Sequence, residues 1–411
     1  MTQNLAVLCA TLDTKGEEAL FLKKELETCG IEVYLIDIGL RRTPSQIAAD
    51  CTQDEVAAAA GSVFEHVEAA PSRSKASEIM AKGLIEVVRR LHSGNKLGGM
   101  ISLGGSGGTT IAAAAMRALP LGVPKLIVGT MAAGNTLPYT QGLDILMLNS
   151  VVDVQSLNFL SRHILTQAAQ ILAAMMKAPA LADAGRTTGK NAVAVTCFGV
   201  TTPCVLRCRA LLEKEGYEVV IFHARGVSGG GLMERMVREG LFRAVLDVTT
   251  TEVIDEVAGG AYAVPGRLNA AAEADIPCVV VPGALEMINI GPEERLRPDQ
   301  AGRIRYYHTP DILKIRADAK DMERAAEIFS QRLGKSQRKT RLTIPMSGFS
   351  AVDAPGEVFF DPEADETFAR EIERLMPSTV PVVRRACHIN DPAFADYIVR
   401  QLLDLLDSES K

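Results

Sequence analysis

Residues 5–39 read LAVLCATLDTKGEEALFLKKELETCGIEVYLIDIG, and residues 191–226 read NAVAVTCFGVTTPCVLRCRALLEKEGYEVVIFHARG. Each stretch begins with an apolar run and passes through a polar turn that contains Thr. Each then continues with helical periodicity to a glycine, Gly30 or Gly216, before Glu-Val and a second apolar run. The stretches align without a gap, because Leu5 matches Asn191 and Gly30 matches Gly216, both at an offset of 186. This repetition predicts an internal duplication.

The repeat continues further along both halves. Residues 124–135 (PKLIVGTMAAGN) are similar to residues 277–289 (PCVVVPGALEMIN), now at an offset of 153. GGMISLGGSGGTT (98–110) has a counterpart in LFRAVLDVTTTEV (241–253). Because the offset falls, we expect the first half to carry extra sequence within residues 40–95.

Apolar runs that alternate with helical patterns predict parallel sheets covered on both faces. The runs are LAVLCA, VYLIDI, GMISL, KLIVG, AVAVTC, VVIF, AVLDV and CVVV. We predict an α/β protein with two doubly wound, Rossmann-like or flavodoxin-like lobes, residues 1–180 and 190–411, joined by the linker-like segment 178–190. Further strands are expected at RLTIPM and VPVVRRA, and further helices at 363–376 and 392–407.

Composition excludes several classes of function. The net charge of the 411 residues is −6, so no overall basic field attracts nucleic acid. No apolar run reaches about 20 residues, and we expect a cytoplasmic protein without a signal peptide or a membrane span. The eight cysteines are scattered without a CxxC pair, which predicts reduced, buried thiols.

The strongest local signal is the loop GGSGGTT, which follows the strand GMISL and opens a helix. Glycine amides at a helix start can approach an anion without obstruction by Cβ atoms. We predict that phosphate binds here, provided that these amides are not already bonded to the protein. The loop is neither a Walker A sequence nor GxGxxG, and the alternative is a glycine turn needed for packing. The candidate residues are Gly104, Gly105, Ser106, Gly107, Gly108 and Thr109.

Three polar residues follow the first strand. Lys15 is a candidate catalytic residue that supplies the positive charge missing from the glycine loop. Asp13 is a candidate ligand for Mg²⁺, and Thr14 a candidate ligand-binding hydroxyl. The alternative for Asp13 and Thr14 is ordinary capping of the next helix.

Two loops of the second half are also candidates. His223 and the run Gly229, Gly230 and Gly231 follow the strand VVIF, with His223 either catalytic or structural. Asp247, Thr249, Thr250 and Glu252 follow the strand AVLDV, and we interpret Glu252 as a helix cap before a ligand contact.

DTK, GGSGGT, HARGVSGGG, DVTTTE, RYYHTP and HINDPAFAD occur in this order along the chain. Together they resemble the tomato mosaic resistance protein-like ATP-binding family, in its stand-alone bacterial form. The resemblance implies a two-lobed, often dimeric, ATP-binding protein whose bacterial members lack an assigned reaction. It supports the candidate residues named above. Ala10 and Thr309 depart from the family pattern, which has Gly and Asn at those places.

The leading hypothesis is an ATP-dependent phosphotransferase or ligase that acts with Mg²⁺ on a small metabolite in a cleft between the lobes, as a homodimer. One alternative is a non-catalytic nucleotide sensor. Another is a hydrolase or isomerase of a phosphorylated or carboxylated metabolite, with His223 as acid–base.

Overall fold

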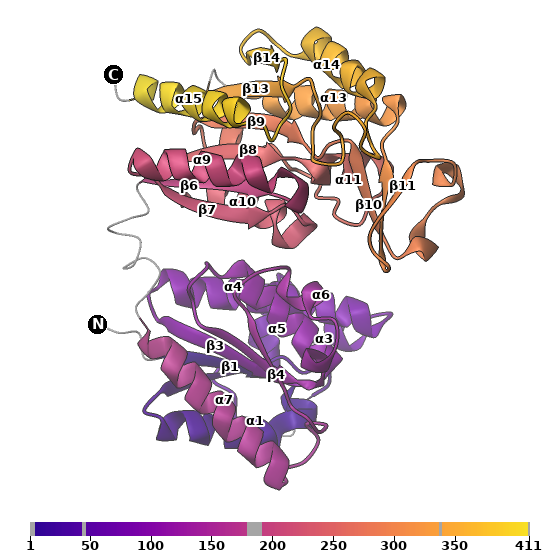
Figure 1. The fold of residues 1–411 in the computed structure, drawn as a ribbon. Helices are drawn as coiled ribbons and strands as arrows, with labels where there is room; N and C mark the ends of the chain where they lie inside the picture. The colour runs from indigo at the N-terminus through magenta and orange to yellow at the C-terminus, as the bar shows by residue number, and fades with distance from the viewer. Residues whose placement is uncertain (1–4, 43–46, 179–190, 337–338, 410–411) are drawn as a thin grey trace. The chain divides into compact units, whose positions relative to one another are not determined.

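The computed structural model describes residues 5–42, 47–178, 191–336 and 339–409. The chain divides into two compact units, unit 1 (residues 1–184) and unit 2 (residues 185–411), and Figure 1 shows a sheet with helices in each. Apart from residue 178, the predicted linker lies outside the described residues.

Unit 1 is built on a five-stranded sheet in the order β2-β1-β3-β4-β5, and every neighbouring pair is parallel. The strands are β1 (Leu5–Ala10), β2 (Glu32–Asp37), β3 (Leu97–Leu103), β4 (Lys125–Gly129) and β5 (Leu146–Asn149). Adjacent side chains of β1 serve different layers: Leu8 packs in the core with α1 (Leu12–Thr28) and α7 (Phe159–Lys177), whereas Val7 packs with the opposite helices. This alternation explains the continuous apolar strands.

The opposite layer of unit 1 contains the remaining helices. They are α2 (Gln53–Ala59), α3 (Phe64–Glu68), α4 (Arg73–Ser93) and α5 (Ser106–Ala118), with the short α6 (Leu137–Thr140) after β4. Between β2 and β3 the chain forms three helices, whereas a single helix joins the second and third strands of unit 2. The extra sequence expected within residues 40–95 is therefore this helical insertion.

Unit 2 repeats the topology with one more strand. Its sheet has the order β14-β13-β9-β8-β6-β7, again parallel throughout. The strands are β6 (Ala192–Cys197), β7 (Glu218–His223), β8 (Ala244–Thr249), β9 (Cys278–Gly283), β13 (Thr340–Pro345) and β14 (Val382–Arg385). The first four strands follow the order 2-1-3-4 found in unit 1, so the predicted duplicated, doubly wound fold is confirmed.

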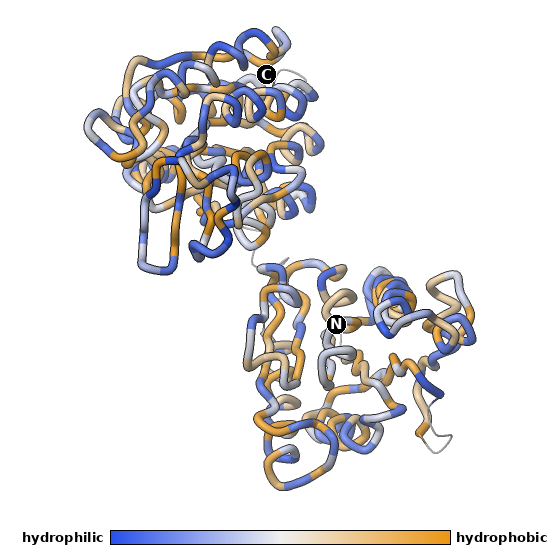
Figure 2. Tube along the Cα trace, turned by 90° about the vertical axis from the view of Figure 1, so that its right-hand side faces the viewer, coloured by the Kyte–Doolittle hydropathy of each residue, from blue (hydrophilic) through white to orange (hydrophobic). Residues whose placement is uncertain are grey.

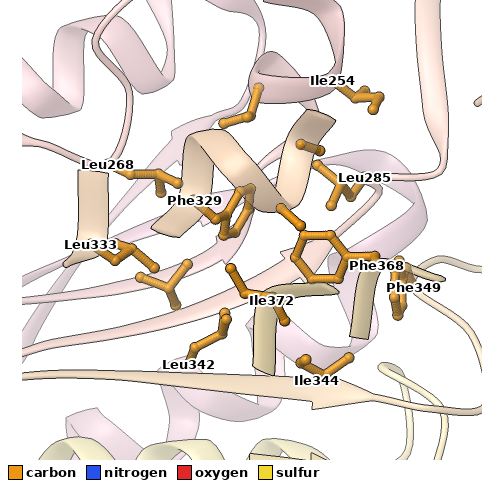
Figure 3. Packing of buried hydrophobic residues seen from close by; sticks show 14 of the residues in the cluster. Ile254, Leu268, Leu285, Phe329, Leu333, Leu342, Ile344, Phe349, Phe368 and Ile372 are labelled. Atoms are coloured by element: carbon orange, nitrogen blue, oxygen red, sulfur yellow. The ribbon is translucent and has the colours of Figure 1, made fainter. Parts of the chain in front are cut away.

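Two helical layers cover this sheet. On one side lie α9 (Thr202–Lys214) and α15 (Pro392–Glu409). The other layer contains α10 (Gly230–Arg238), α11 (Thr251–Ala258), α12 (Ala270–Glu273), α13 (Ala319–Leu333) and α14 (Pro362–Leu375). Figure 3 shows Phe329 and Phe368 at the centre of this second core, with their rings edge to face and their centroids 5.2 Å apart.

A small antiparallel sheet is inserted after β9, in the order β10-β12-β11. Its strands are β10 (Met287–Gly291), β11 (Arg305–Thr309) and β12 (Ile312–Arg316). The sequence analysis did not predict these strands or β5. Figure 2 shows how apolar and polar residues alternate along the chain of each unit. In the part of the chain that is described, no helix has the length and apolar character needed to span a bilayer.

Candidate functional site

The candidate site lies where the strand order of unit 1 reverses. β1 connects to β2 on one side, and the chain then crosses to β3 on the other side of β1. Ligands of doubly wound sheets bind at such a reversal, beyond the carboxyl ends of the strands. The two loops that meet there are the turn after β1 and the glycine loop after β3.

The glycine loop presents unused donors. Gly105 occupies the N-cap position of α5 and provides no side-chain cap, and the first helical bond runs from the Thr109 amide to the Gly105 carbonyl. Within the described residues, the amides of Ser106, Gly107 and Gly108 have no protein acceptor. These groups also lie at the positive end of the helix dipole. Thr109 itself is fully buried, and its hydroxyl finds no partner among the described residues.

The turn after β1 is anchored by a residue of β2. The Asp37 carboxylate accepts hydrogen bonds from the amides of Leu12, at 3.2 Å, and Gly39, at 2.9 Å. The Thr11 and Thr14 hydroxyl oxygens are 3.1 Å apart. Burial raises the pKa of Asp13, while a hydrogen bond from Thr14 and the charges of Arg41 and Arg73 oppose this shift.

One cavity of about 490 Å³ joins the two loops. It brings together the predicted residues Asp13, Thr14, Gly107 and Gly108. The full lining consists of Thr11, Asp13, Thr14, Leu40, Arg41, Val67, Glu68, Ala70, Ser72, Arg73, Ala76, Gly107, Gly108 and Ile111. The helical insertion therefore forms one wall of the cavity.

Two cations of this cavity were missed by the sequence analysis. Arg73 is the first residue of α4, and a Cβ atom added at Gly107 would lie 3.2 Å from one of its Nη atoms. Arg41 follows β2 and also lines the cavity. Both come from the segment that the analysis treated only as extra sequence. The signal available was a basic residue beside the capping Ser72 in the stretch SRSK.

Lys15 does not line this cavity. Its side chain is buried, and its Nζ atom lies 3.9 Å from a carboxylate oxygen of Asp153. Its backbone is not helical, with φ −131° and ψ 25°, which separates it from the regular helix that follows. Arg41 and Arg73, rather than Lys15, therefore place positive charge beside the glycine loop.

The glycine loop of unit 2 is partly occupied by a carboxylate of the protein itself. Oε1 of Glu252 accepts hydrogen bonds from the amides of Gly226, at 3.0 Å, and Gly230, at 2.8 Å, at the start of α10. The Gly229 amide donates to the Gly226 carbonyl. A Cβ atom at Gly230 would lie 2.3 Å from Oε2 of Glu252, so glycine is required for this close approach. Glu252 thus takes the place that a ligand anion would need at the Gly230 amide, whereas the Gly231 amide has no acceptor among the described residues.

Glu252 belongs to a buried ionic network around Arg267. The fully buried guanidinium pairs with Glu252 at 2.7 Å, Asp247 at 2.8 Å and Glu234 at 3.0 Å. Burial raises the pKa of Glu252 and of Glu234, and the charge of Arg267 opposes both shifts. The sequence analysis did not identify this network, because Glu252, Asp247 and Glu234 are 15, 20 and 33 residues from Arg267, the residue that they share.

The remaining candidates of unit 2 fall into two groups. Thr249 and Thr250 are fully buried, with Thr249 Oγ1 2.8 Å from Thr201 Oγ1 and Thr250 Oγ1 donating to the Val281 carbonyl. Together with Asp247 they lie in the interior, away from a ligand-accessible surface. His223, in contrast, is exposed at the end of β7 and stacks on Phe198, with ring centroids 5.2 Å apart.

The cavity of unit 1 suits phosphate better than a protein-held magnesium ion. Free amides and two guanidinium groups complement negatively charged oxygens. Asp13 is flanked by Arg41 and Arg73, and no group of three His, Cys, Asp or Glu side chains in the described residues is placed to hold a metal. The carboxylates of Asp13 and Glu68 line the cavity, and Mg²⁺ needs only one or two carboxylates together with phosphate oxygens, so magnesium binding stays a prediction and we derive no chemical step through Mg²⁺.

Comparison with known proteins identifies relatives over nearly the whole chain. Models of the N-terminal and C-terminal domains of an uncharacterised protein family, UPF0261, match residues 4–180 and 190–406. A UPF0261 protein of Clostridium tetani (strain Massachusetts / E88) is 40% identical over 403 residues, 98% of each chain. The ToMV resistance protein Tm-1(GCR237) of Solanum lycopersicum is 35% identical over 419 residues, which is 97% of this chain and 55% of the tomato protein.

This chain therefore spans about half the length of the tomato protein. Among solved structures, the UDP-N-acetylglucosamine 2-epimerase from Rickettsia bellii covers 98% of this chain and 96% of its own, with a TM-score of 0.23 and 10% identity. At that TM-score the likeness carries no argument. The family descriptions assign neither a ligand nor a reaction, so ATP binding stays a prediction.

Replacing Arg267 with Met should lower the free energy of unfolding of unit 2 by about 3–5 kcal/mol, because three buried carboxylates lose their shared cation. Arg209→Met is the matched control, since the exposed Arg209 forms its ion pair in the described part of the chain with Glu213 one turn away, and we expect an effect within about 0.5 kcal/mol. Denaturant unfolding measures both. Equal unfolding midpoints for the two variants would show that the ionic network around Arg267 does not stabilise unit 2.

Proposed function

The chain belongs to the UPF0261 family, and on that premise we propose that unit 1 binds the phosphate groups of a nucleotide, ATP by preference. The observation that carries the proposal is the juxtaposition in one cavity of unpaired amides at the start of α5 with Arg41 and Arg73. Backbone donors, the helix dipole and guanidinium groups all favour an anion at the same place.

The rest of the cavity suits a nucleoside. Its volume of about 490 Å³ falls within the range of roughly 300–1,000 Å³ that is typical of small-molecule sites. Leu40, Val67, Ala70, Ala76 and Ile111 give it apolar surface on which a base can lie. A ligand that carries both anionic and apolar groups matches this mixed lining.

We further propose that the nucleotide serves an ATP-dependent reaction on a small metabolite. Asp13 supports this proposal, because a carboxylate is of little use for binding phosphate. Its raised pKa suits a general base that accepts the proton of an acceptor hydroxyl. The cavity residues position phosphate and the attacking group, which is most of what phosphoryl transfer requires.

Gly105→Asp tests whether the amides at the start of α5 bind phosphate, and it preserves the fold. The Gly105 backbone has the extended geometry of an N-cap, and a Cβ atom there meets nothing within 4 Å. The new carboxylate should accept from the amides of the first turn, so helix stability stays equal or rises by a few tenths of a kcal/mol. Because the new carboxylate occupies the amides that would bind phosphate, we expect ATP affinity in calorimetry to fall about tenfold or more. Gly105→Ala, which leaves the amides free, is the control, and undiminished affinity in the Asp variant would remove α5 from the proposal.

Arg73→Gln tests whether the guanidinium group of Arg73 contacts the phosphates of the nucleotide. Loss of a charge-assisted contact worth about 1.5–3 kcal/mol should weaken ATP binding by roughly 10-fold to 100-fold and reduce its dependence on salt. Arg89→Gln on the same helix removes an exposed arginine that pairs with Glu86, and it should bind ATP as the native protein does. If both variants bind equally well, Arg73 does not contact the phosphates.

Asp13→Asn separates an enzyme from a nucleotide sensor. Removing a negative charge beside the phosphates should leave ATP affinity unchanged or raise it, whereas turnover should fall about 100-fold or more if Asp13 is the base. ADP formation with ATP and a metabolite pool is the measurement. Turnover at the native rate contradicts the role of Asp13, and native protein that binds ATP without consuming it is a sensor.

A further inference from the structure

A second group of reactive side chains lies at the carboxyl end of the unit 2 sheet, outside the site described above. Phe198 directly follows β6, and His223 is the last residue of β7. Lys314 lies in β12 directly opposite Asn289 of β10. Directly opposed residues of an antiparallel pair share a face of the sheet, so Lys314 and Asn289 lie side by side.

Lys314 is a buried amine without an oxygen partner. It is 3% exposed. Its Nζ atom contacts Sδ of Met287 at 3.3 Å and lies 4.1 Å from the centroid of the Phe198 ring. No carboxylate or carbonyl among the described residues accepts a hydrogen bond from it. Burial lowers the pKa of Lys314 to about 8, against the charges of Glu286 and Asp255, so a larger share of the amine is unprotonated at neutral pH than in an ordinary lysine.

Two acceptor atoms near this amine are also unused. Oδ1 of Asn289 and Oε2 of Glu286 are buried and have no hydrogen-bond partner among the described residues. The amide nitrogen of Asn289 donates to Thr251 and Asp255 at 3.0 and 3.2 Å, which fixes the orientation of this side chain. Buried polar atoms are rarely left unpaired in a folded protein, and a cluster of them around a buried amine indicates a ligand.

The rim of this cluster carries the positive charge of Arg225 beside the imidazole of His223. His223 stacks on Phe198 and is exposed. Nε of Arg225 donates to the Tyr262 hydroxyl at 3.2 Å. Burial lowers the pKa of His223, and the charges of Arg225 and Lys314 add to this shift, so all three groups lie near one another. An anionic group on a ligand would be attracted to this rim.

We propose that unit 2 holds a second site in which Lys314 is the nucleophilic amine for a small carbonyl compound that carries a carboxylate. The carboxylate pairs with Arg225, and Nζ of Lys314 reaches the carbonyl carbon when the Phe198 ring turns aside. The nitrogen lone pair forms the new C–N bond. The carbonyl oxygen then leaves as water with both hydrogens of the amine, and an imine remains. Amines desolvated in apolar surroundings act in this way, and the step consumes no oxidant or reductant.

Reductive trapping of the full chain tests the site. Pyruvate or acetone, a ketone without a carboxylate, is added at neutral pH with sodium cyanoborohydride, which reduces an imine to a stable amine in preference to the free carbonyl compound, and the modified peptides are mapped by mass spectrometry. We expect pyruvate to modify Lys314 at least tenfold faster than the exposed Lys320, and Arg225→Gln to slow only the reaction with pyruvate. Absence of a Lys314 adduct with either compound would overturn the site. If the native chain traps the two compounds equally, the proposal that the ligand carries a carboxylate is wrong.

Lys314→Met separates this role from a structural one. Met has a similar length and suits the contacts with Phe198 and Met287, and it removes a buried charge. We therefore expect an equal or higher Tm together with loss of trapping. A lower Tm would show that the lysine serves the fold. ATP affinity should not change in this variant, so failure of this site and failure of the unit 1 site are distinguishable.

Discussion

The first amides of a helix have no partner inside the helix, and this constraint organises both glycine-rich loops of the molecule. At the start of α10 the protein meets it in part internally, because the Glu252 carboxylate accepts from the Gly230 amide and from Gly226 in the preceding turn. At the start of α5 nothing in the described residues accepts from the first amides, which border a cavity with Arg73 on its wall. Two loops of the same chemical character therefore differ in their surroundings: a carboxylate of the protein bonds to one, and the other borders an open cavity.

The ionic network of unit 2 follows from the use of a buried carboxylate as the acceptor for these amides. A carboxylate that is buried to satisfy amides needs a cation, and Arg267 supplies it for Glu252, Asp247 and Glu234 together. With three carboxylates around one guanidinium, the network depends on each of its hydrogen bonds. This explains why a strand-end acidic residue such as Asp247, which would bind a ligand in many doubly wound proteins, is turned inward here.

Much of the fold could be predicted, and the failures have physical causes. Strands buried on both faces gave continuous apolar runs, and the constant offset between Gly30 and Gly216 indicated a duplicated topology that the sheet orders share. β5 was missed because it has four residues at a sheet edge and carries no clear period. The small sheet was missed because β10 follows β9 within a few residues, and because charged residues such as Lys314 are buried there against the usual pattern.

The sequence by itself determined the fold class, the two halves and the places where glycine permits an anion to approach, because periodicity and the absence of a Cβ atom are local properties of the chain. Only the tertiary structure decided which of those places is open. That outcome depends on residues that are far apart in the sequence, such as Arg73, which lies beside Gly107, and Glu252, which accepts from Gly226. Charged groups and acceptor atoms from other elements either bond to the first amides of a helix or leave those amides free. No local pattern in the sequence predicts which of the two occurs.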